Sequence, residues 1–425
     1  MRILRLKREQ IYTEVIAGVT TFLTMAYIIF VNPQILSMAG MDKIALISVT
    51  CFVTGVVTIA TGLLTNTPIT MAPGMGLNAF FAYTLVINGH ISWQIGLGIV
   101  FLSGLFFLLL SCLGLRQKIV KEIPKDLLNA IPVGIGIFIA FIGLQNLGLV
   151  VKSPVTMVSG GPLTATVLIG IVGLLIIILL EVKKIRGSLL IGILSSTVLG
   201  LIFGYVKMPD RFISFDFNLS TTFLKLDIIG ALKISFLGPI FTLMFVDMFD
   251  SIGSLIGLGK EAGFIDKNGD MKKLNSLLVI DAGATMFGAI VGTSTTTTYI
   301  ESAAGIEEGG RTGLTAIVTG ILFLFSIIFI PILSIVPKYA TAPALIIVGF
   351  LMMKNISKID FKNFEIGFPS FMIIVMIALC YSISTGLAFG FLSYTLIKVL
   401  RGKFKEISTT LWVINLLSLI YFVTL

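Results

Sequence analysis

Long, uninterrupted runs of apolar residues recur from residue 15 to the last residue of the chain. A run of about 20 apolar residues is enough for a helix to cross the hydrocarbon core of a bilayer. Because lipid cannot satisfy backbone polar groups, such segments must be helices or strands of a closed barrel, and unalternating runs indicate helices. With 56% hydrophobic and 12% charged residues, no region remains for a separate soluble domain. We therefore expect an all-α, multi-pass membrane protein.

Fourteen candidate spans can be delimited, and a further apolar segment, 409-425, closes the chain at the short limit for a span. We expect the protein to lie in the plasma membrane with its basic N-terminus (residues 1–8) in the cytoplasm. In that orientation the connections after even-numbered spans are cytoplasmic and should be rich in Lys and Arg. They are, as Lys183, Lys184 and Arg186 illustrate after the sixth span, and the loop 206-229 is the main exception. The spans are approximately 15-36, 44-64, 70-86, 95-115, 129-150, 163-181, 187-205, 230-258, 277-292, 294-306, 312-336, 341-353, 366-384 and 385-400.

The third and tenth spans are interrupted. The third begins TNTPITMAPGMGLNAFFAY, where proline and glycine forbid a continuous helix, so an extended segment should precede a half-helix near Leu77. The tenth begins GTSTTTTYIESAAG, where four consecutive threonines favour an extended backbone before a short helix at about Glu301. Irregular backbone at membrane depth survives only inside protein or beside a water-filled cavity. One interruption in each half of the chain is typical of an inverted-repeat transporter.

The two halves follow the same pattern. Residues 55-70 and 283-298 each run from a Gly-rich helix into a Thr-rich extended segment of equal length, although few residues are identical. Seven spans precede the loop 206-229 and seven follow it. Because seven is odd, the second set of spans enters the membrane from the opposite side and is inverted relative to the first. We expect a first repeat at 1-205, an outer connecting loop at 206-229, a second repeat at 230-408 and a C-terminal hydrophobic segment at 409-425.

Two aspartates in the eighth span are the first candidates for a functional site. An ionised carboxylate at membrane depth costs at least about 2.5 kcal/mol, so Asp247 and Asp250 need polar partners, protonation or a function. Their spacing of three places both on one face with Ser251 and Ser254, and we expect that face to look into the protein. Asn78 and Glu301 should lie at the starts of the two half-helices, whose free amides suit a carboxylate or a heterocycle.

Each of these residues has a structural alternative. The aspartates could form a network that only holds broken helices together, and Glu301 could be only a helix cap. Asn78 could likewise be a cap, and the threonine run a strand filler. Asp281, at the start of the ninth span, is expected to be interfacial, and His90 is expected to be solvated in an outer loop. APGMGLN lacks the ending of a phosphate-binding loop.

Other classes of function are disfavoured by the residues present. The net charge of +9 comes from short loops, which indicates membrane topology and no nucleic-acid partner. Three cysteines in apolar segments, Cys51, Cys112 and Cys380, predict neither a disulfide framework nor a zinc site, and a single histidine excludes a multi-histidine metal centre. No cofactor is indicated. A membrane enzyme would need a nucleophile with its base or a metal cluster, which this chain lacks.

Four motifs together resemble the AzgA-like purine permeases, a branch of the nucleobase-cation symporter (xanthine/uracil permease) superfamily. The motifs are TEVIAGVTTFLTMAYIIFVNP, MAPGMGLNAFFAYT, FVDMFDSIGSLIG and TTTTYIESAAGIEEGGRTGL, and the resemblance covers essentially the whole chain. It implies fourteen spans in two inverted repeats of seven, core and gate domains, and short strands in spans three and ten that face each other. It also implies proton-driven uptake of adenine, guanine or hypoxanthine, and a homodimer.

The resemblance also assigns roles to particular residues. Asp250 takes the place of the substrate-contacting acid of the eighth span and Glu301 that of the tenth, while Asp247 and Asn78 match polar positions important to the purine branch. Asn78 and Tyr299, which is close to Glu301 in the sequence, are also expected to bind the substrate. The sequence has FDSIGS and IESAAG where the xanthine/uracil branch has A-E-H-I-G-H and Q-N-x-G. These departures disfavour uracil and xanthine and leave no histidine for a proton relay.

The prediction is therefore a proton-coupled purine importer that works by alternating access. In it, Glu301 and Asp250 hydrogen-bond the purine edge, and Asp247 or Asp250 carries the coupling proton. A transporter of another nucleobase or of an anion on the same fold is the alternative. Three carboxylates disfavour an anion, and a closed site of carboxylates and broken helices disfavours a channel.

Overall fold

The computed structural model describes residues 7–113, 122–215, 217, 219–266, 271 and 273–424. The basic residues predicted to set topology at positions 1–6 lie outside these ranges. Within the described residues, ten helices are long and apolar enough to cross a membrane. Four shorter apolar helices accompany them, at 75–88, 188–202, 364–380 and 409–423. The expectation of a mostly helical, multi-pass membrane protein is confirmed.

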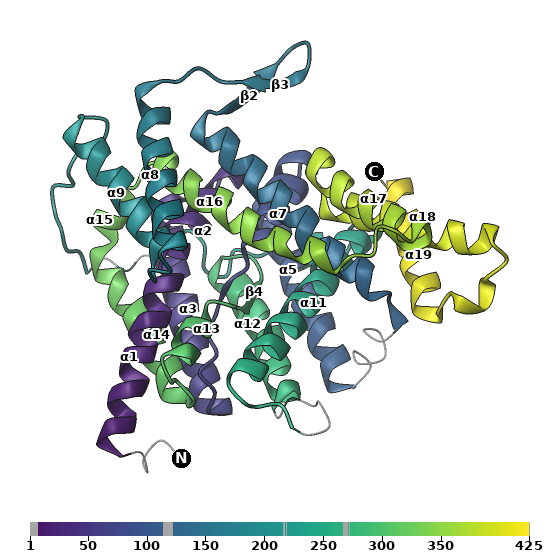
Figure 1. The fold of residues 1–425 in the computed structure, drawn as a ribbon, viewed down its shortest axis with the longest axis horizontal. Coiled ribbons are helices and arrows are strands. Elements are labelled where there is room, and N and C mark those ends of the chain that lie inside the picture. Colours follow the sequence, from purple (N-terminus) through teal and green to yellow (C-terminus); the bar gives the residue numbers. More distant parts are fainter. Residues whose placement is uncertain are drawn as a thin grey trace.

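The first half of the chain forms helices on both sides of a short buried strand (Figure 1). Its first span is nearly continuous across α1 and α2, with a tightened turn where the carbonyls of Ala26 and Tyr27 accept from the amides of Ile29 and Phe30, three residues further on. The elements are α1 (Arg8–Met25), α2 (Ile28–Leu36), η2 (Ser37–Ala39), α3 (Lys43–Thr65), β1 (Met71–Pro73), α4 (Met75–Ala79), the π-helical η3 (Phe80–Asn88), α5 (Trp93–Cys112), α7 (Lys125–Leu147), β2 (Val150–Ser153), β3 (Met157–Gly160), α8 (Ala165–Val182) and α9 (Ser188–Ile202).

The second half begins differently from the prediction of one helix over 230-258. Two short segments come first, and the long helix α11 starts only at Leu237, with Pro239 in its first turn, where no intrahelical amide bond is lost. The elements are α10 (Ile228–Ala231), η4 (Ile234–Phe236), α11 (Leu237–Glu261), α12 (Leu274–Val291), β4 (Thr296–Thr298), α13 (Ser302–Glu307), α14 (Gly313–Ser326), η5 (Ile327–Phe329), α15 (Ile330–Ser334), α16 (Lys338–Met353), η6 (Lys354–Lys358), α17 (Phe364–Cys380), α18 (Ile383–Leu400), η7 (Phe404–Glu406) and α19 (Thr409–Thr424).

The two extended segments predicted in the third and tenth spans are present and pair with each other. β1 and β4 form an antiparallel ladder in which Met71, Ala72 and Pro73 face Thr298, Thr297 and Thr296. All six residues are buried, and β4 lies in the interior of the bundle (Figure 1). Each strand thereby satisfies backbone groups that neither lipid nor a helix could satisfy.

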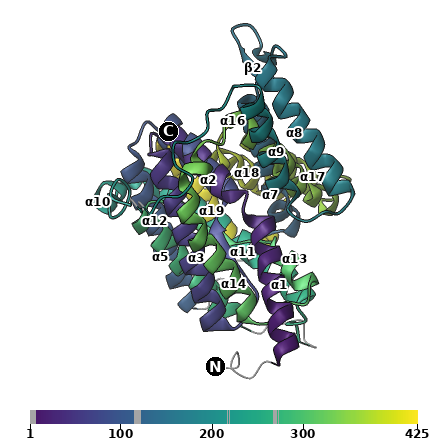
Figure 2. The ribbon, with the colours of Figure 1, turned by 90° about the vertical axis from the view of Figure 1, so that its left-hand side faces the viewer.

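The helices pack as two groups around this strand pair. In one group α3 lies along α14, and a Cβ added at Gly313 would come within 2.0 Å of the Gly62 carbonyl oxygen, so only glycine permits this approach. In the other group α7 lies along α16 through Gly136 and Gly349. Figure 2 shows α7, α8, α9, α16 and α17 together on one side and α3, α5, α12 and α14 on the other. The strand pair belongs to the second of these sides, because β4 packs on α11 and α12 and β1 packs on α3.

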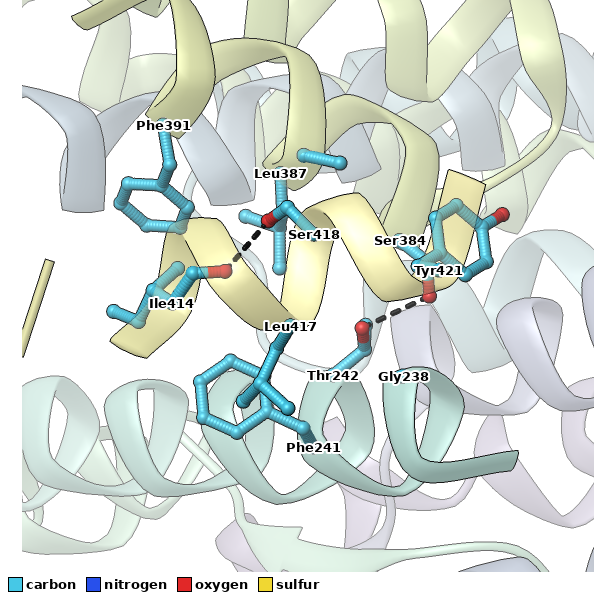
Figure 3. Close-up of a pocket in the computed structure, with 11 residues that line it drawn as sticks. Gly238, Phe241, Thr242, Ser384, Leu387, Phe391, Ile414, Leu417, Ser418 and Tyr421 are labelled. Carbon is cyan, nitrogen blue, oxygen red and sulfur yellow. Dashed lines mark hydrogen bonds between the residues drawn. The ribbon is translucent and has the colours of Figure 1, made fainter. Parts of the chain in front are cut away.

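Within the C-terminal segment, whose placement was open, residues 409–424 form the helix α19, which packs against α18 and α11. A pocket between these three helices is lined mainly by apolar side chains such as Phe241, Leu387 and Ile414 (Figure 3). Its hydroxyl groups bond internally, as Ser384 does to Thr242 at 2.9 Å. None of the predicted site residues lines this pocket. Asp247 and Tyr299 instead lie beside the strand pair.

Candidate functional site

The two aspartates of α11 do not share one environment. Asp247 is buried, with 1% of its surface exposed, and the side chain points toward α12 and β4, where Thr285 Oγ1 donates to its Oδ2 at 2.9 Å. Asp250 is exposed, as are Gly253 and Gly257 further along the same face of α11. Only Asp247 is covered by neighbouring side chains, so the two carboxylates differ in their access to water. A spacing of three residues leaves the two side chains about 60° apart around the helix, and the packing of α12 covers only one of them.

Asp281 corrects a second expectation, because it is not interfacial. It lies in α12 with none of its surface exposed, and it accepts hydrogen bonds from Ser251 Oγ at 2.6 Å and Thr298 Oγ1 at 3.3 Å. α12 begins at Leu274, three residues before the expected start of the span, so Asp281 is two turns inside the helix. The hydroxyl groups of Ser251 on α11 and Thr298 on β4 provide the hydrogen bonds that stabilise this buried carboxylate. Asp281 thus joins Asp247, Asp250 and Glu301 as a fourth acidic residue around β4 and the start of α13.

Glu301 stands where the half-helix was predicted to begin, immediately before α13. Its side chain makes no capping hydrogen bond to the first turn of α13, so the alternative of a simple cap is not what the structure contains. It instead accepts a hydrogen bond from Tyr27 Oη at 2.6 Å. Tyr27 lies at the tightened turn between α1 and α2 and is 1% exposed. Glu301 itself is half-buried, which leaves part of its carboxylate free for another partner.

Tyr27 is a site residue that the sequence reasoning did not single out. The signal available was a tyrosine in the middle of an apolar span, within the first of the four motifs. A buried tyrosine hydroxyl needs a hydrogen-bond partner, but nothing in the local sequence names an acceptor 274 residues away. The contact exists because α1 packs along α13 and α14.

Tyr299 joins the two interrupted spans. Its hydroxyl donates to the Pro73 carbonyl oxygen at 2.6 Å, and its backbone amide donates to the Thr70 carbonyl oxygen at 3.0 Å. Ser302 adds a further link, with its hydroxyl 2.7 Å from that of Thr70. Tyr299 is buried and its hydroxyl is hydrogen-bonded to β1, so only its ring can line a binding site. These contacts hold Glu301 in a defined position relative to β1.

Asn78 lies in α4 with both ends of its amide occupied. Its Oδ1 accepts from Ser294 Oγ at 2.5 Å, and its Nδ2 donates to Asn32 Oδ1 at 2.6 Å. Asn32 in turn donates to the hydroxyls of Thr50 and Thr293, at 2.7 and 3.2 Å. All of these side chains are fully buried. The amide of Asn78 therefore connects α4 to α2 and, through Ser294, to the segment that leads into β4.

The site is acidic and lacks a balancing cation. Among the described residues, no lysine or arginine forms an ion pair with Asp247, Asp250, Asp281 or Glu301. Asp250 lies on α11 and Glu301 at the start of α13, and these two elements pack against each other. The described part of the chain contains no group of three His, Cys, Asp or Glu residues that could hold a metal ion. The groups that remain accessible are two carboxylates, which can accept N–H donors or, when protonated, donate to a ring nitrogen or carbonyl.

Comparison with known proteins places this arrangement in a family. The sequence model described as "Permease family" (Xan_ur_permease) matches residues 12–389. The adenine permease AdeQ of Escherichia coli K12 is 42% identical over 397 residues, which are 93% of this chain and 89% of that protein. The guanine/hypoxanthine permease PbuG of Bacillus subtilis 168 is 40% identical over 424 residues, covering 97% of this chain and 96% of that protein.

The fold is also similar to that of proteins whose sequences differ strongly from this one. The transmembrane domain of the cyanobacterial bicarbonate transporter BicA superposes with a TM-score of 0.68 at 16% identity, over 89% of this chain and 98% of that domain. At such low identity the match concerns the fold alone. The chain therefore belongs to the Permease family (Xan_ur_permease), among its AzgA-like adenine and guanine/hypoxanthine permeases, and is a multi-pass membrane transporter and not an enzyme.

Proposed function

We propose that this permease imports the purine nucleobases adenine, guanine and hypoxanthine by proton symport. The observation that carries the proposal is that an exposed Asp250 on α11 and a half-buried Glu301 at the start of α13 stand on two elements that pack against each other. The purine edge presents N–H donors beside ring-nitrogen or carbonyl acceptors, which two carboxylates sharing a proton complement. The names of its relatives, adenine and guanine/hypoxanthine permeases, support the same substrate class.

In this proposal Glu301 and Asp250 bind the purine edge, and the ring of Tyr299 lies beside them. Asp247, one turn before Asp250, or Asp250 itself carries the coupling proton. Removing a carboxylate from water disfavours its charged form, so a site closed from water favours proton uptake together with the neutral substrate. Asn78 contributes through the network that positions α4 and not through a free amide group.

The architecture that we propose has fourteen spans in two inverted repeats of seven. The ten long helices, the three shorter apolar helices at 75–88, 188–202 and 364–380, and the β4–α13 segment supply fourteen crossings. Both halves place a strand and a short helix third, and the antiparallel pairing of β1 with β4 agrees with a two-fold axis in the membrane plane. The group that contains the strand pair would be the core and the group around α7 and α16 the gate.

Alternating access would follow from movement of the core past the gate. In the proposed orientation the N-terminus is cytoplasmic and the protein resides in the plasma membrane, because Lys and Arg concentrate in the connections after even-numbered spans. The exposed face of α11 that carries Asp250, Gly253 and Gly257 would line the path between the two groups. Glycine at two positions leaves room there for a substrate.

Anion transport on the same fold is the competing proposal, given the likeness to a bicarbonate transporter. A carboxylate pair without a neighbouring cation repels an anion, so the described site favours a neutral heterocycle. Uptake of radiolabelled adenine, guanine, hypoxanthine, uracil and bicarbonate into proteoliposomes, with and without an inward proton gradient, separates the two. We expect gradient-driven accumulation of purines and none of bicarbonate. Absence of purine uptake under every gradient would refute the proposed function.

Replacing Tyr27 with phenylalanine should weaken purine binding without unfolding the protein. The change removes only the hydroxyl that donates to Glu301 at 2.6 Å, and a hydrogen bond to a charged group contributes about 1.5–3 kcal/mol. If that bond aims the carboxylate at the substrate, the KM for uptake should rise roughly tenfold or more. Tyr12→Phe is the matched control, because Tyr12 is 70% exposed. An unchanged KM in Tyr27→Phe would show that the hydroxyl has no part in positioning Glu301.

A further inference from the structure

Two buried aspartates on neighbouring helices each accept a hydrogen bond from a hydroxyl group of the other helix. On α11, Asp247 is followed one turn later by Ser251, and on α12, Asp281 is followed one turn later by Thr285. Ser251 Oγ donates to Asp281 Oδ2 at 2.6 Å, and Thr285 Oγ1 donates to Asp247 Oδ2 at 2.9 Å. Each carboxylate therefore receives a hydroxyl from the opposite helix. No more than 1% of the surface of any of the four residues is exposed.

The strand β4 forms the third wall of this group. Because Ser251 uses its proton toward Asp281, Thr297, whose Oγ1 lies 2.7 Å away, must donate to Ser251. Thr298 Oγ1 donates to the other oxygen of Asp281 at 3.3 Å. Thr285 also accepts from the Thr296 amide at 3.2 Å. The hydrogen bonds of the two carboxylates thus determine how β4 sits against α11 and α12.

The group holds more negative charge than its partners can balance. No lysine or arginine of the described residues pairs with either aspartate, and Asp247 Oδ1 is buried without a hydrogen-bond partner. Two ionised carboxylates in one desolvated network would repel each other at high cost, whereas a single proton on the pair removes one charge. An acceptor oxygen without a donor is the place where such a proton could bind.

We infer that Asp247 and Asp281 together hold one exchangeable proton, and that this proton is the one coupled to substrate movement. The inference rests on the proposed function and adds Asp281, to which no role has been assigned. The proton enters from water by way of the exposed Asp250, one turn from Asp247, and leaves to water on the opposite side of the membrane. Loss of the proton leaves two negative charges that repel each other, and because Thr298 of β4 donates to Asp281, this alters the position of β4.

The substrate site lies directly beyond β4. Thr298 is followed by Tyr299, which is anchored to β1, and by Glu301, which receives the hydroxyl of Tyr27. A shift of β4 would therefore move Glu301 relative to Asp250. Titratable groups on neighbouring elements include Asp250, Lys260 and Glu261 on α11, Tyr299 and Glu301 after β4, Glu307 on α13, Tyr394 and Lys398 on α18, Lys43 and Cys51 on α3, and Cys112 at the end of α5.

The decisive variant is Asp281→Asn, which keeps the shape of the side chain and removes its titration. Purified wild type and variant in proteoliposomes would be assayed for guanine accumulation driven by an inward proton gradient, and for guanine exchange at equal pH on both sides. We expect accumulation to fall at least about 30-fold while exchange stays within about threefold, because exchange needs no net proton movement. Asp210→Asn, at an exposed position, is the matched control and should resemble wild type.

A second variant covers the case in which Asp281→Asn does not fold. Asp281→Glu retains a carboxylic acid but changes its reach toward Ser251, so the pH at which driven uptake is half-maximal should shift relative to wild type. Normal driven accumulation in Asp281→Asn, a loss of exchange equal to the loss of accumulation, or an unshifted pH profile in Asp281→Glu would overturn the inference. Wild type that does not transport purine at all would instead refute the proposed function.

Discussion

Glu301→Gln should lower purine uptake at least about 100-fold while the protein remains folded. The substitution keeps the size of the side chain but replaces an acceptor-only carboxylate by an amide that is neutral and has its own N–H donors. Both the bond from Tyr27 at 2.6 Å and the proposed bonds from the purine edge lose the contribution of the charge. Hydrogen bonds to charged groups contribute about 1.5–3 kcal/mol each, so the loss of two accounts for a decrease of this size.

Initial uptake rates of radiolabelled hypoxanthine and guanine into proteoliposomes would measure this effect, with equilibrium binding to the detergent-solubilised protein as a second assay. Glu9→Gln is the matched control, since Glu9 is exposed at the start of α1 and should transport as wild type does. Size-exclusion profiles of both variants establish that they are folded. Uptake and binding at wild-type levels in Glu301→Gln would remove Glu301 from the site, and the same result in Asp250→Asn would refute the binding arrangement as a whole.

Asn78→Ala should destabilise the protein more than it alters substrate affinity. The amide of Asn78 links Ser294 to Asn32, and its removal leaves a buried hydroxyl and a buried amide oxygen without partners. An unsatisfied buried polar group costs about 1–3 kcal/mol, and here two are created in a region with no exposed surface. The affected contacts hold α4, α2 and the segment before β4 together, so the whole strand pair is weakened.

The midpoint of thermal unfolding in detergent is the measurement for Asn78→Ala, and we expect it to fall by several degrees. The KM for purine uptake by the remaining folded protein should change by less than about threefold. Asn88→Ala, on the exposed end of η3, provides the control and should leave the midpoint unchanged. If Asn78→Ala instead raises KM strongly at an unchanged midpoint, the residue contacts substrate directly, as the resemblance to purine permeases implied.

Local sequence was sufficient to predict the irregular backbone of the site. Proline and glycine before Leu77 interrupt a helix, the threonine run before Tyr299 favours an extended backbone, and both segments contain strands in the structure. Their mutual pairing was implied only by the family resemblance, because no local pattern reports which of several extended segments will meet. The start of α11 at Leu237 was missed for a related reason. Hydropathy records whether a residue tolerates lipid, whereas the beginning of a helix depends on backbone hydrogen bonds and neighbours.

Side-chain direction was the property that sequence could not supply. Asp247 and Asp250 are three residues apart on one helix, yet the first is buried against α12 and the second is exposed. Which face of a helix is covered depends on the rotation at which it packs, and an apolar helix in lipid has apolar residues on every side. The usual amphipathic signal for the buried face is therefore absent. Asp281 was predicted to lie at the membrane interface for the same reason. The sequence showed only its distance from the predicted start of the helix and contained no information on which residues would cover it.

Composition and hydropathy by themselves determined that this chain is a helical membrane protein, and the placement of acidic residues in apolar spans singled out Asp247, Asp250 and Glu301. These conclusions hold for any packing, because transfer of a charge or an unpaired backbone group into lipid is costly whatever lies beside it. Only the tertiary structure joined Tyr27 to Glu301, Asn32 to Asn78, and Asp281 to Ser251 and Thr298. Those contacts span up to 274 residues of chain and arise from helix packing, so their partners could be identified only after the helices were placed.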